Sequence, residues 1–584
     1  MQARQALADI QHLLTNVLQA PAQWQALAPF ADTDAELAAQ VLDEAAKFVD
    51  SAIAPLQRSG DEEGCRFDAG QVHTPAGFRD AYQAFWQAGW PLLSCAPDDG
   101  GQGLPAVLEC VLFEWLAGAN HGWTMAPGLL HGAYECIKHH ASDELKAQYL
   151  PKIATGEWLA TMCLTEAHAG SDLGLVRTRG VPQPDGSARV NGSKIFISGG
   201  EHDLTDNIVH LVLARLPDAP AGPKGLSLFL VPKVLPDGSR NAVVCERIEE
   251  KMGLHGSPTC VMRFDDATGW LVGEPNKGLN AMFVMMNAAR LHVGLQGIGL
   301  LEAAWQKASA YAAERRQMRA PGATDTSLIQ DHPAIRRTLQ TQRAWIDGGR
   351  VLAYHTALQL DIAKHSANAG ERAAAQRWCA LVTPVLKAAL TTEGFHGASA
   401  CLQVFGGHGY VREWGIEQIV RDARVAMIYE GTNEIQAIDL LVRKVLADGG
   451  QGLAALLASL PGKAPGAAAR ARRHTLVEIT QTLAIAAQTD PELPYWVADD
   501  YLRAVALVLL EWAWGQISAA NPRDPASAPT SAFERWDQPA KAFAQWVLPE
   551  FDLRTTIVRQ RIVQALEIKP KQPLALDGKA LIAI

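Results

Sequence analysis

IYEGTNEIQ, at residues Ile428–Gln436, follows QVFGGHGY at Gln403–Tyr410 by a short helical stretch in this chain of 584 residues. In the first of these motifs, Glu430 follows a tyrosine and precedes a glycine, so the backbone can open beside its carboxylate. A general base requires a positioned and desolvated carboxylate. The motif therefore indicates a catalytic glutamate. The alternative for Glu430 alone is a helix-terminal carboxylate with a partner four residues away.

The composition is that of a large globular protein. Hydrophobic residues make up 48% and charged residues 20% of the chain, which is long enough for several domains. There are 52 basic and 62 acidic residues, which give a formal charge of -10. This balance argues against a nucleic-acid or anionic-membrane surface as the main partner.

The cysteines and the apolar stretches bear on the compartment. Nine cysteines without a CxxC pair are typical of reduced thiols in a cytoplasmic protein, rather than a disulfide framework or a metal site. The first 23 residues lack the basic and apolar regions of a signal peptide. The most apolar stretch, Tyr501–Ala520, contains Arg503 and Glu511 and is expected to be a core helix, not a transmembrane segment.

The periodicity of apolar residues changes along the chain. Helical spacing predicts helices over Leu37–Phe48 and Gly77–Trp90, a long helix over Asn280–Gln317 and another that begins at Pro333. Short alternating runs between turn residues predict strands instead. These runs are Ala188–Val190, Ile195–Ser198, Ile208–Ala214 and Leu226–Val231.

These patterns predict an α+β multidomain protein. A stretch rich in glycine, alanine and proline, residues 449–465, is expected to be a linker. The expected order is an N-terminal extension (1–35), a helical domain (36–158), a β domain (159–275), a helical domain that contains Glu430 (276–448) and an additional C-terminal helical domain (466–584).

The motifs together resemble the acyl-CoA dehydrogenase family, over roughly residues 37–445 and with at least four motifs in the family's order. The resemblance implies an N-terminal helical domain, a middle β-barrel or sandwich and a C-terminal four-helix bundle. The extra C-terminal domain is similar to that of a longer bacterial subgroup. The family binds FAD non-covalently, usually passes electrons to electron transfer flavoprotein, and in this subgroup forms homodimers.

Two segments of the β domain resemble the family's flavin-contacting segments. In the loop Met162–Asp172, the resemblance gives Leu164, Thr165 and Ser171 contacts with the flavin, and Ser171 a contact with substrate; the family usually has proline where Ala167 stands. A generic capped loop is the alternative. In the strand Lys194–Gly200, the resemblance places Phe196 against the flavin ring and Ser198 at its N5 edge. An ordinary strand that ends in a Gly-Gly turn is the alternative.

Two further segments are less specific. The segment Lys251–Thr259 resembles a family signature, but its glycines and proline are equally explained as turns, and His255 is more typical of packing than of catalysis. Arg290 is a candidate substrate contact on a helix. Part of the family carries its catalytic base beside this arginine, where this chain has Ala289, which leaves Glu430 as the base.

The adenosine side of the cofactor is assigned by the same resemblance. The glycines near residue 406 would allow close approach of the backbone. The segment Gly297–Glu302 begins like a dinucleotide-binding loop but lies in a helical run, so it is not expected to bind a nucleotide. By the resemblance, Arg315 and Gln317 would reach the flavin pyrophosphate from a neighbouring subunit. The other expected contacts are Gln403, Gly406, Gly407, Thr432 and Glu434.

The resemblance implies α,β-dehydrogenation of an acyl-CoA thioester to the trans-2-enoyl-CoA. Glu430 would take the α-proton while the β-hydrogen leaves as hydride to flavin N5. The backbone N–H of Glu430 would bind the thioester oxygen, and Tyr429 and Gly431 would contact the substrate. An acyl-CoA oxidase, which passes electrons to oxygen, is the alternative enzyme, and a non-catalytic scaffold is the alternative of another class. No metal is expected.

Overall fold

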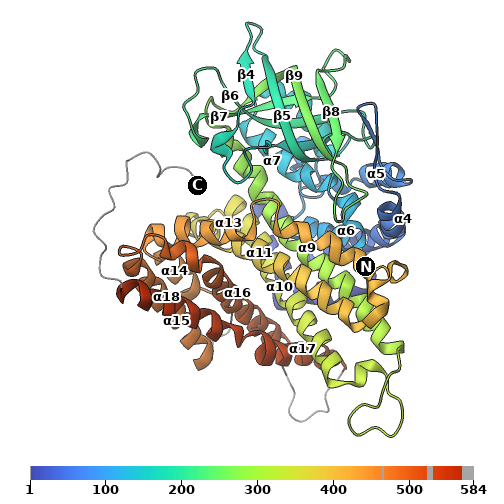
Figure 1. Ribbon diagram of the computed structural model, residues 1–584, viewed down its shortest axis with the longest axis vertical. Coiled ribbons are helices and arrows are strands. Elements are labelled where there is room, and N and C mark those ends of the chain that lie inside the picture. The colour runs from blue at the N-terminus through green and yellow to red at the C-terminus, as the bar shows by residue number, and fades with distance from the viewer. Residues whose placement is uncertain (1, 463–465, 523–530, 568–584) are drawn as a thin grey trace. The chain divides into compact units, whose positions relative to one another are not determined.

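The fold is described from a computed structural model, which describes residues 2–462, 466–522 and 531–567 (Figure 1). Chain contacts divide these residues into two compact units. The first, called the helical unit, comprises the residues up to 47, 105–119 and the residues from 293 onward. The second, called the β unit, comprises residues 48–104 and 120–292. Each unit is therefore built from segments that are far apart in the sequence.

The β unit combines a large sheet, a small hairpin and short helices. Its helices are α4 (Leu56–Glu63), α5 (Phe78–Gln87), α7 (Leu130–His140) and α8 (Asp143–Thr155). Its strands are β1 (Arg66–Asp68), β2 (Gln71–His73), β3 (Leu159–Cys163), β4 (Arg179–Pro182), β5 (Ala188–Ser198), β6 (Ile208–Arg215), β7 (Leu226–Pro232), β8 (Val243–Ile248) and β9 (Thr259–Val272).

The strand pairings of the β unit close into a barrel. Strands β4, β5, β9, β7 and β6 pair in that order, and β6 pairs again with β4 through Arg179 and Arg215. Strand β3 adds to β6 in parallel, and β8 adds to β9. Figure 1 shows these strands wrapping around one another. Closure removes free edges from the five central strands, so most of the ladder hydrogen bonds are satisfied inside the unit.

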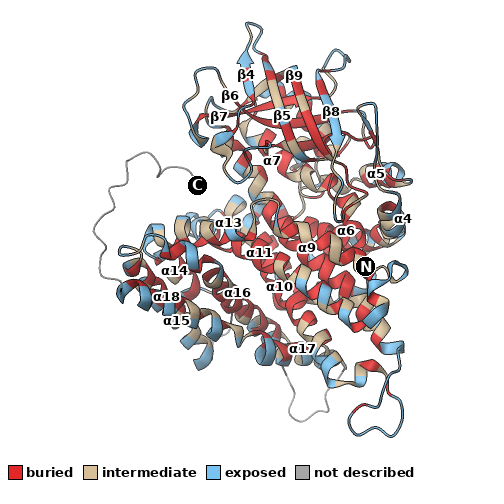
Figure 2. Cartoon of the chain, in the orientation of Figure 1, coloured by how far each residue is buried: buried red, intermediate tan, exposed pale blue. Residues whose placement is uncertain are grey.

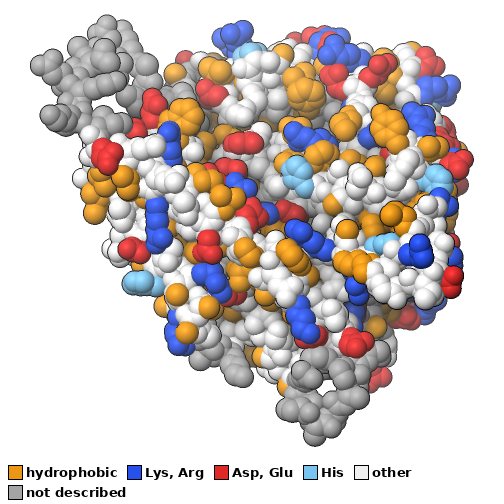
Figure 3. Space-filling view, turned by 60° about the horizontal axis from the view of Figure 1, so that its bottom comes forward, with side chains coloured by type: hydrophobic (Ala, Val, Ile, Leu, Met, Phe, Trp, Pro, Cys, Tyr) orange, Lys and Arg blue, Asp and Glu red, His pale blue; other side chains and the backbone are white. Residues whose placement is uncertain are grey.

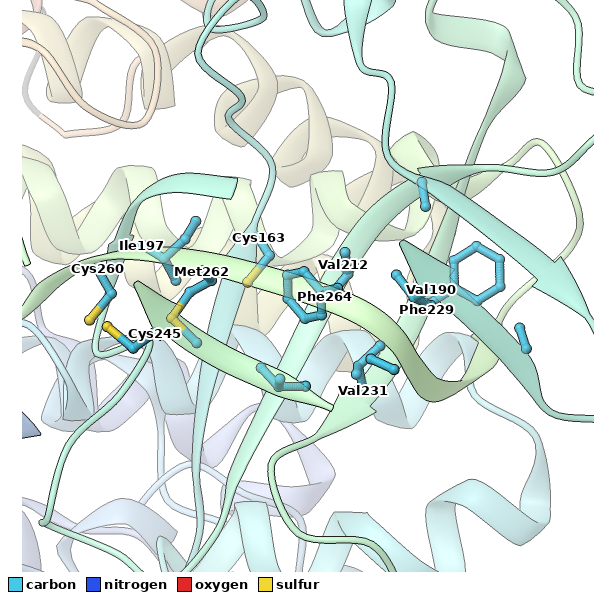
Figure 4. Packing of buried hydrophobic residues seen from close by; sticks show 14 of the residues in the cluster. Cys163, Val190, Ile197, Val212, Phe229, Val231, Cys245, Cys260, Met262 and Phe264 are labelled. Carbon is cyan, nitrogen blue, oxygen red and sulfur yellow. The ribbon is translucent and has the colours of Figure 1, made fainter. Parts of the chain in front are cut away.

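The interior of the barrel is filled by inward-facing aliphatic, sulfur-containing and aromatic side chains (Figure 4). Phe229, Phe264 and Met262 are at most 1% exposed. Cys245 and Cys260 lie in the same cluster as free thiols. All nine cysteines are described and none forms a disulfide, which agrees with the expected reduced thiols.

The helical unit consists of long helices with short connections. Three helices contribute residues to both units: α3 (Ala35–Phe48), α6 (Ala106–Thr124), which is broken at Asn120, and α9 (Gly278–Glu314). The others are α1 (Ala3–His12), α2 (Ala20–Gln25), α10 (Pro333–His365), α11 (Ala369–Val404), α12 (Ile416–Ala423), α13 (Asn433–Ile438), α14 (Gln451–Ala458), α15 (Ala467–Ala486), α16 (Leu493–Ala520), α17 (Ser531–Ala542) and α18 (Glu550–Glu567).

Glycines allow the central helices to pack closely. A side chain at Gly297 of α9 would lie 2.4 Å from the carbonyl oxygen of Leu390 on α11, and one at Gly299 would lie 2.2 Å from that of Glu114 on α6. These are the glycines of the segment that resembles a dinucleotide-binding loop. They permit backbone contact between helices, so the expectation that this segment is not such a loop is confirmed.

A chain of ion pairs, buried at its centre and partly exposed at its Asp9 end, runs through the helical unit. Arg350 of α10 binds Glu114 of α6 at 2.6 Å and Glu302 of α9 at 3.1 Å, and none of the three is more than 2% exposed. Arg343 joins Glu302 to Asp347, and Arg535 of α17 continues from Asp347 to Asp9 of α1. Burial opposes ionisation of Asp347, but Arg343 and Arg535 hold its pKa well below the usual range.

Helix α16 is buried along most of its length (Figure 2). Its Arg503 binds Glu393 of α11 at 2.6 Å and Glu550 of α18 at 2.8 Å, and lies over the ring of Trp345. The core-helix prediction for Tyr501–Ala520 is therefore confirmed. In the described residues, no helix is long and apolar enough to cross a membrane.

The predicted fold class is confirmed, with three local differences. The linker prediction is wrong over Gln451–Ala458, because α14 forms there and buries Leu453, Leu456 and Leu457; residues 463–465 of that segment lie outside the described residues. The hairpin of β1 and β2 interrupts a stretch that was expected to be helical. The two runs predicted within 188–198 form one strand, β5, whose register with β9 shifts twice.

Candidate functional site

The predicted base lies on a strained loop between α12 and α13. Glu430 has a φ of +55° and Gly431 a φ of +81°, so two successive residues adopt left-handed backbone conformations. For a glutamate this conformation costs of order 1–3 kcal/mol and persists only where surrounding contacts enforce it. The side chain of Glu430 is neither fully buried nor fully exposed. The loop thus holds a partly accessible carboxylate in a fixed backbone geometry.

Three buried polar side chains enforce this geometry: two bind carbonyl oxygens of the loop, and the third ties the loop to α11. Gln436 donates to the carbonyl oxygen of Glu430 at 2.9 Å. Lys387 of α11, which is 0% exposed, donates to the carbonyl oxygen of Gly431 at 2.7 Å and to Oδ1 of Asn433 at 2.9 Å. Asn433 in turn donates to the carbonyl oxygen of Ala388 at 3.1 Å. Helix α11 therefore anchors the loop directly.

The residues on either side of Glu430 are also fixed. Tyr429 donates its hydroxyl to Oε1 of Gln296 on α9 at 2.5 Å, and burial raises the pKa of Tyr429 well above its usual value. Thr432 caps α13, since its hydroxyl accepts the N–H of Ile435. Glu434, in the first turn of α13, is exposed. The helical unit thus brings the candidate residues Tyr429, Glu430, Gly431, Thr432 and Glu434 together.

In the β unit, a buried ion pair organises the loop that contains Leu164, Thr165 and Ser171. Lys194 of β5, which is 0% exposed, donates to the carbonyl oxygen of Leu164 and to Glu166, both at 2.9 Å. The N–H of Ile195 also binds the carbonyl oxygen of Thr165 at 2.9 Å. The loop is therefore tied to the strand that carries Phe196 and Ser198.

The carboxylate of Glu166 holds the returning half of the same loop. It accepts the backbone N–H of Arg177 at 2.8 Å and that of Thr178 at 3.0 Å. Burial opposes its ionisation, but Lys194 and these donors together lower the pKa of Glu166. Glu166 is consequently a buried carboxylate that remains charged. Between these anchors, Ala167 and Ser171 are exposed, while Leu164 and Thr165 are partly exposed.

Phe196 lies at a bulge of strand β5. The register of β5 with β9 shifts between Lys194 and Ile197, and Phe196 has a φ of +60°. Such a backbone is a genuine outlier for a bulky residue. Phe196 is 61% exposed, whereas Ile197 is 2% exposed in the barrel core. The aromatic ring is therefore presented outward by strained backbone, and Ser198 beyond it is partly exposed.

The candidates for the adenosine side gather where α9 and α11 end. Tyr311 stacks on Phe405 with ring centroids 4.3 Å apart and lies within hydrogen-bond distance of His408, at 3.0 Å. This aromatic contact brings Arg315 and Gln317, which follow α9, near the other segment. That segment contains Gln403, at the end of α11, and the start of the short helix η10 (Gly406–Tyr410). Arg315, Gln317, Gln403, Gly406 and Gly407 are all exposed.

The two weaker candidates occupy structural positions in the β unit. Arg290 is buried on α9 and donates to Oδ1 of Asn287 at 3.3 Å. His255 lies 2.9 Å from a carboxylate oxygen of Asp61, and its second ring nitrogen lies 3.0 Å from the carbonyl oxygen of Lys251. These contacts agree with the expectation that His255 is a packing histidine.

The residues that hold the two loops were not selected from the sequence. Lys387 could have been found as the single charged residue in the apolar run Ala380–Leu390, because a lysine inside such a run requires a buried partner. Asn433 and Gln436 lie within the motif around Glu430, as polar residues at the start of a helix. Glu166 and Lys194 lie inside the two segments that resemble flavin-contacting segments. Neither was predicted as a functional residue, because the resemblance gives roles only to their neighbours.

Comparison with protein families gives three adjacent matches. The N-terminal domain of acyl-CoA dehydrogenases matches residues 35–157, the middle domain matches 161–267 and the C-terminal domain matches 276–445. Together these domains span more than half of the chain. They leave the first 34 residues and the helices after α13 unmatched.

Individual relatives extend the similarity beyond these domains. A 3-methylmercaptopropionyl-CoA dehydrogenase of Ruegeria pomeroyi is 41% identical over 93% of this chain and 95% of its own length. A broad-specificity linear acyl-CoA dehydrogenase of Mycobacterium tuberculosis is 36% identical over 73% of this chain and 72% of its own. An acyl-CoA dehydrogenase of Bacillus anthracis complexed with FAD shares the fold, with a TM-score of 0.72, 20% identity and 92% of each chain covered.

Proposed function

We propose a reaction for this chain from one premise: it belongs to the acyl-CoA dehydrogenase family, whose members are oxidoreductases that act on CH–CH bonds. The proposed reaction is the α,β-dehydrogenation of an acyl-CoA thioester to the trans-2-enoyl-CoA. FAD, when bound, supplies the hydride acceptor. Electrons then pass to electron transfer flavoprotein.

Glu430 is the proposed base that removes the α-proton. The supporting observation is the left-handed backbone at Glu430, which Gln436 and Lys387 enforce through the carbonyl oxygens of Glu430 and Gly431. In the proposed reaction, the backbone N–H of Glu430 stabilises the developing negative charge on the thioester oxygen. Tyr429 and Gly431 flank the acyl group, and Arg290 and Ser171 contribute further substrate contacts.

The proposed cofactor residues fit FAD in character. Phe196 offers an outward aromatic ring, and Leu164, Thr165 and Ser198 offer accessible backbone and hydroxyl groups beside it. A side chain at Gly406 or Gly407 would meet no atom within 4 Å, so the backbone there is open to a pyrophosphate. Arg315 supplies a cation for the same group, and Gln317, Gln403, Thr432 and Glu434 supply polar contacts.

The test of this function is the anaerobic addition of acyl-CoA thioesters, 3-methylmercaptopropionyl-CoA among them, to the flavin-loaded protein. The flavin absorbance should bleach with the wild type. Glu430→Gln should retain flavin and bleach at least ~10³-fold more slowly, the scale of a lost general base. Glu413→Gln, at an exposed glutamate outside the proposed site, is the matched control. Bleaching of Glu430→Gln at nearly the wild-type rate would exclude Glu430 as the base.

The electron acceptor is tested separately. Reduced protein should be reoxidised rapidly by electron transfer flavoprotein and slowly by oxygen. Rapid peroxide formation without another acceptor would instead identify an acyl-CoA oxidase.

On the side of the molecule in Figure 3, acidic and basic side chains are interspersed, and neither kind is gathered into a patch of its own.

The assembly and compartment are also proposals. We infer that the protein is cytoplasmic, as its sequence indicates. We also infer a homodimer, because the matched bacterial relative has nearly the same length and the helices after α13 cover one side of α10 and α11 within the chain itself. Light scattering should give twice the mass of one chain. A tetramer would contradict the inferred homodimer. The domain limits given from the sequence remain proposals as well.

A further inference from the structure

A cavity of about 430 Å³ lies within the helical unit and includes none of the residues of the proposed active site. Its walls come from the short helix η1 (Leu13–Val17), from α10, α11 and α14, and from α16. The residues from η1, α14 and α16 lie outside the three matched family domains. The cavity therefore forms only where the terminal segments of this chain meet the family's helical domain. Its volume is within the range of small-molecule sites.

One end of the cavity is a cluster of aromatic rings. The ring of His355 meets the ring of Trp378 edge-on at 4.6 Å and that of Trp512 at 5.0 Å. The indole N–H groups are already used, by the hydroxyl of Thr356 and the carbonyl oxygen of Pro461 respectively. The two indoles therefore offer the cavity apolar surface. Leu18 and Leu456 extend this surface.

His355 supplies a polar group at the same end. It lines the cavity and is only 6% exposed, yet neither of its ring nitrogens has a hydrogen-bond partner among the described residues. Burial lowers the pKa of His355 to about 4, so the ring is neutral near pH 7 and can donate one hydrogen bond.

The described residues that line the cavity include a cationic side chain and no anionic one. Arg377 of α11 lines the cavity and has no ion-pair partner among the described residues, and no described lining residue is Asp or Glu. The chain as a whole carries a formal charge of -10, so a cavity with only a cation is distinctive. An arginine without a carboxylate partner favours an anion, and a planar fork of N–H donors suits a carboxylate.

We propose that this cavity binds a small monocarboxylate with an apolar body. The carboxylate accepts hydrogen bonds from His355 and Arg377, and the apolar body packs on Trp378, Trp512 and Leu456. This site is separate from the proposed acyl-CoA site and does not depend on the proposed reaction.

The test is calorimetric titration of the flavin-loaded protein with octanoate, octan-1-ol and octylamine, which share an apolar body and differ in charge. Octanoate should bind once per chain, and the alcohol and the amine at least about tenfold more weakly, since a hydrogen bond to a charged group is worth more than one factor of ten. Arg377→Gln should weaken octanoate by about the same factor. Arg336→Gln, at another exposed arginine of the helical unit, should leave binding unchanged.

A substitution that fills the cavity provides an independent test. Leu456→Trp should abolish octanoate binding while dehydrogenation of acyl-CoA continues; if this variant does not fold, Arg377→Gln decides alone. Three results would overturn the proposal: no binding of octanoate at millimolar concentration, equal binding of all three compounds, or competition between octanoate and an acyl-CoA. The last result would assign the octanoate site to the acyl-CoA pocket.

Discussion

Two loops of this chain each depend on a lysine with no exposed surface, but the two lysines bind different partners. Lys194 in the β unit binds a carboxylate, that of Glu166, together with the carbonyl oxygen of Leu164. Lys387 in the helical unit binds a backbone carbonyl and the side-chain amide of Asn433. The first loop is thus held through a buried carboxylate, and the second through carbonyl and amide oxygens beside a strained backbone. The difference predicts different responses to substitution and to acid.

Removal of Lys194 should have the largest effect. Lys194→Met leaves the buried carboxylate of Glu166 without its cation, and breaking such a pair costs about 3–5 kcal/mol. Flavin content and the urea midpoint for flavin release should both fall. The double variant Lys194→Met, Glu166→Gln should recover much of the loss, because no charge is left buried. A single variant as stable as the wild type would show that the pair does not hold the loop.

Removal of Lys387 should affect turnover more than flavin binding. Lys387→Met deprives Gly431 and Asn433 of a donor, and each buried acceptor left unsatisfied costs about 1–3 kcal/mol. The position of Glu430 should then relax, and a displacement of about 1 Å is enough to lower kcat about 100-fold. Single-turnover rates and flavin content measure the two effects separately. Lys541→Met, at an exposed lysine, should change neither. If Lys387→Met loses flavin but the flavin-loaded fraction turns over normally, Lys387 serves flavin binding and does not position Glu430.

The hydroxyl of Tyr429 should make a smaller contribution. Tyr429→Phe removes one hydrogen bond to Gln296, worth about 0.5–1.5 kcal/mol. A double-mutant cycle with Gln296→Leu should give a coupling free energy in that range. If the Tyr429 hydroxyl also contacts the acyl group that Tyr429 is proposed to flank, Tyr429→Phe will raise KM in the Gln296→Leu background as well.

The smallest effect concerns pH. The pKa of Glu166 is lower in the folded chain than its ordinary value of 4.5. Its ionised form therefore stabilises the fold above about pH 4.5, and this contribution is lost as the pH falls through the folded-state pKa. The wild type should release flavin on acidification more steeply than the Lys194→Met, Glu166→Gln variant. Parallel release curves for the two proteins would show that this pair does not control acid sensitivity.

The sequence predicted the elements and the candidate residues better than the contacts that position them. The long helix α9, the start of α10 at Pro333 and the strands β6 and β7 agree with the predicted runs, because each has a clear apolar period. Helix α14 was taken for a linker, because glycine and proline surround a short apolar segment whose burial depends on tertiary contacts. Periodicity carries no information on such contacts.

The candidate site shows the same division. The motif identified Glu430, but its left-handed backbone arises from Lys387 and Gln436 acting together, and no pattern along the chain links them. Phe196 was expected on a regular alternating strand, whereas it lies at a bulge. The bulge is set by pairing with β9, a strand about 60 residues further along and absent from the predicted runs.

The chain of ion pairs in the helical unit has a consequence for biosynthesis. Asp9 binds Arg535, and 526 positions separate them. At a synthesis rate of about 5–20 residues per second, Arg535 is synthesised about half a minute to nearly two minutes after Asp9. Asp347 waits for the same arginine, whereas every residue of the β unit up to His292 has by then left the ribosome. A nascent chain shorter than about 540 residues therefore exposes an unfinished helical unit, and a premature stop there should send the product to proteolysis.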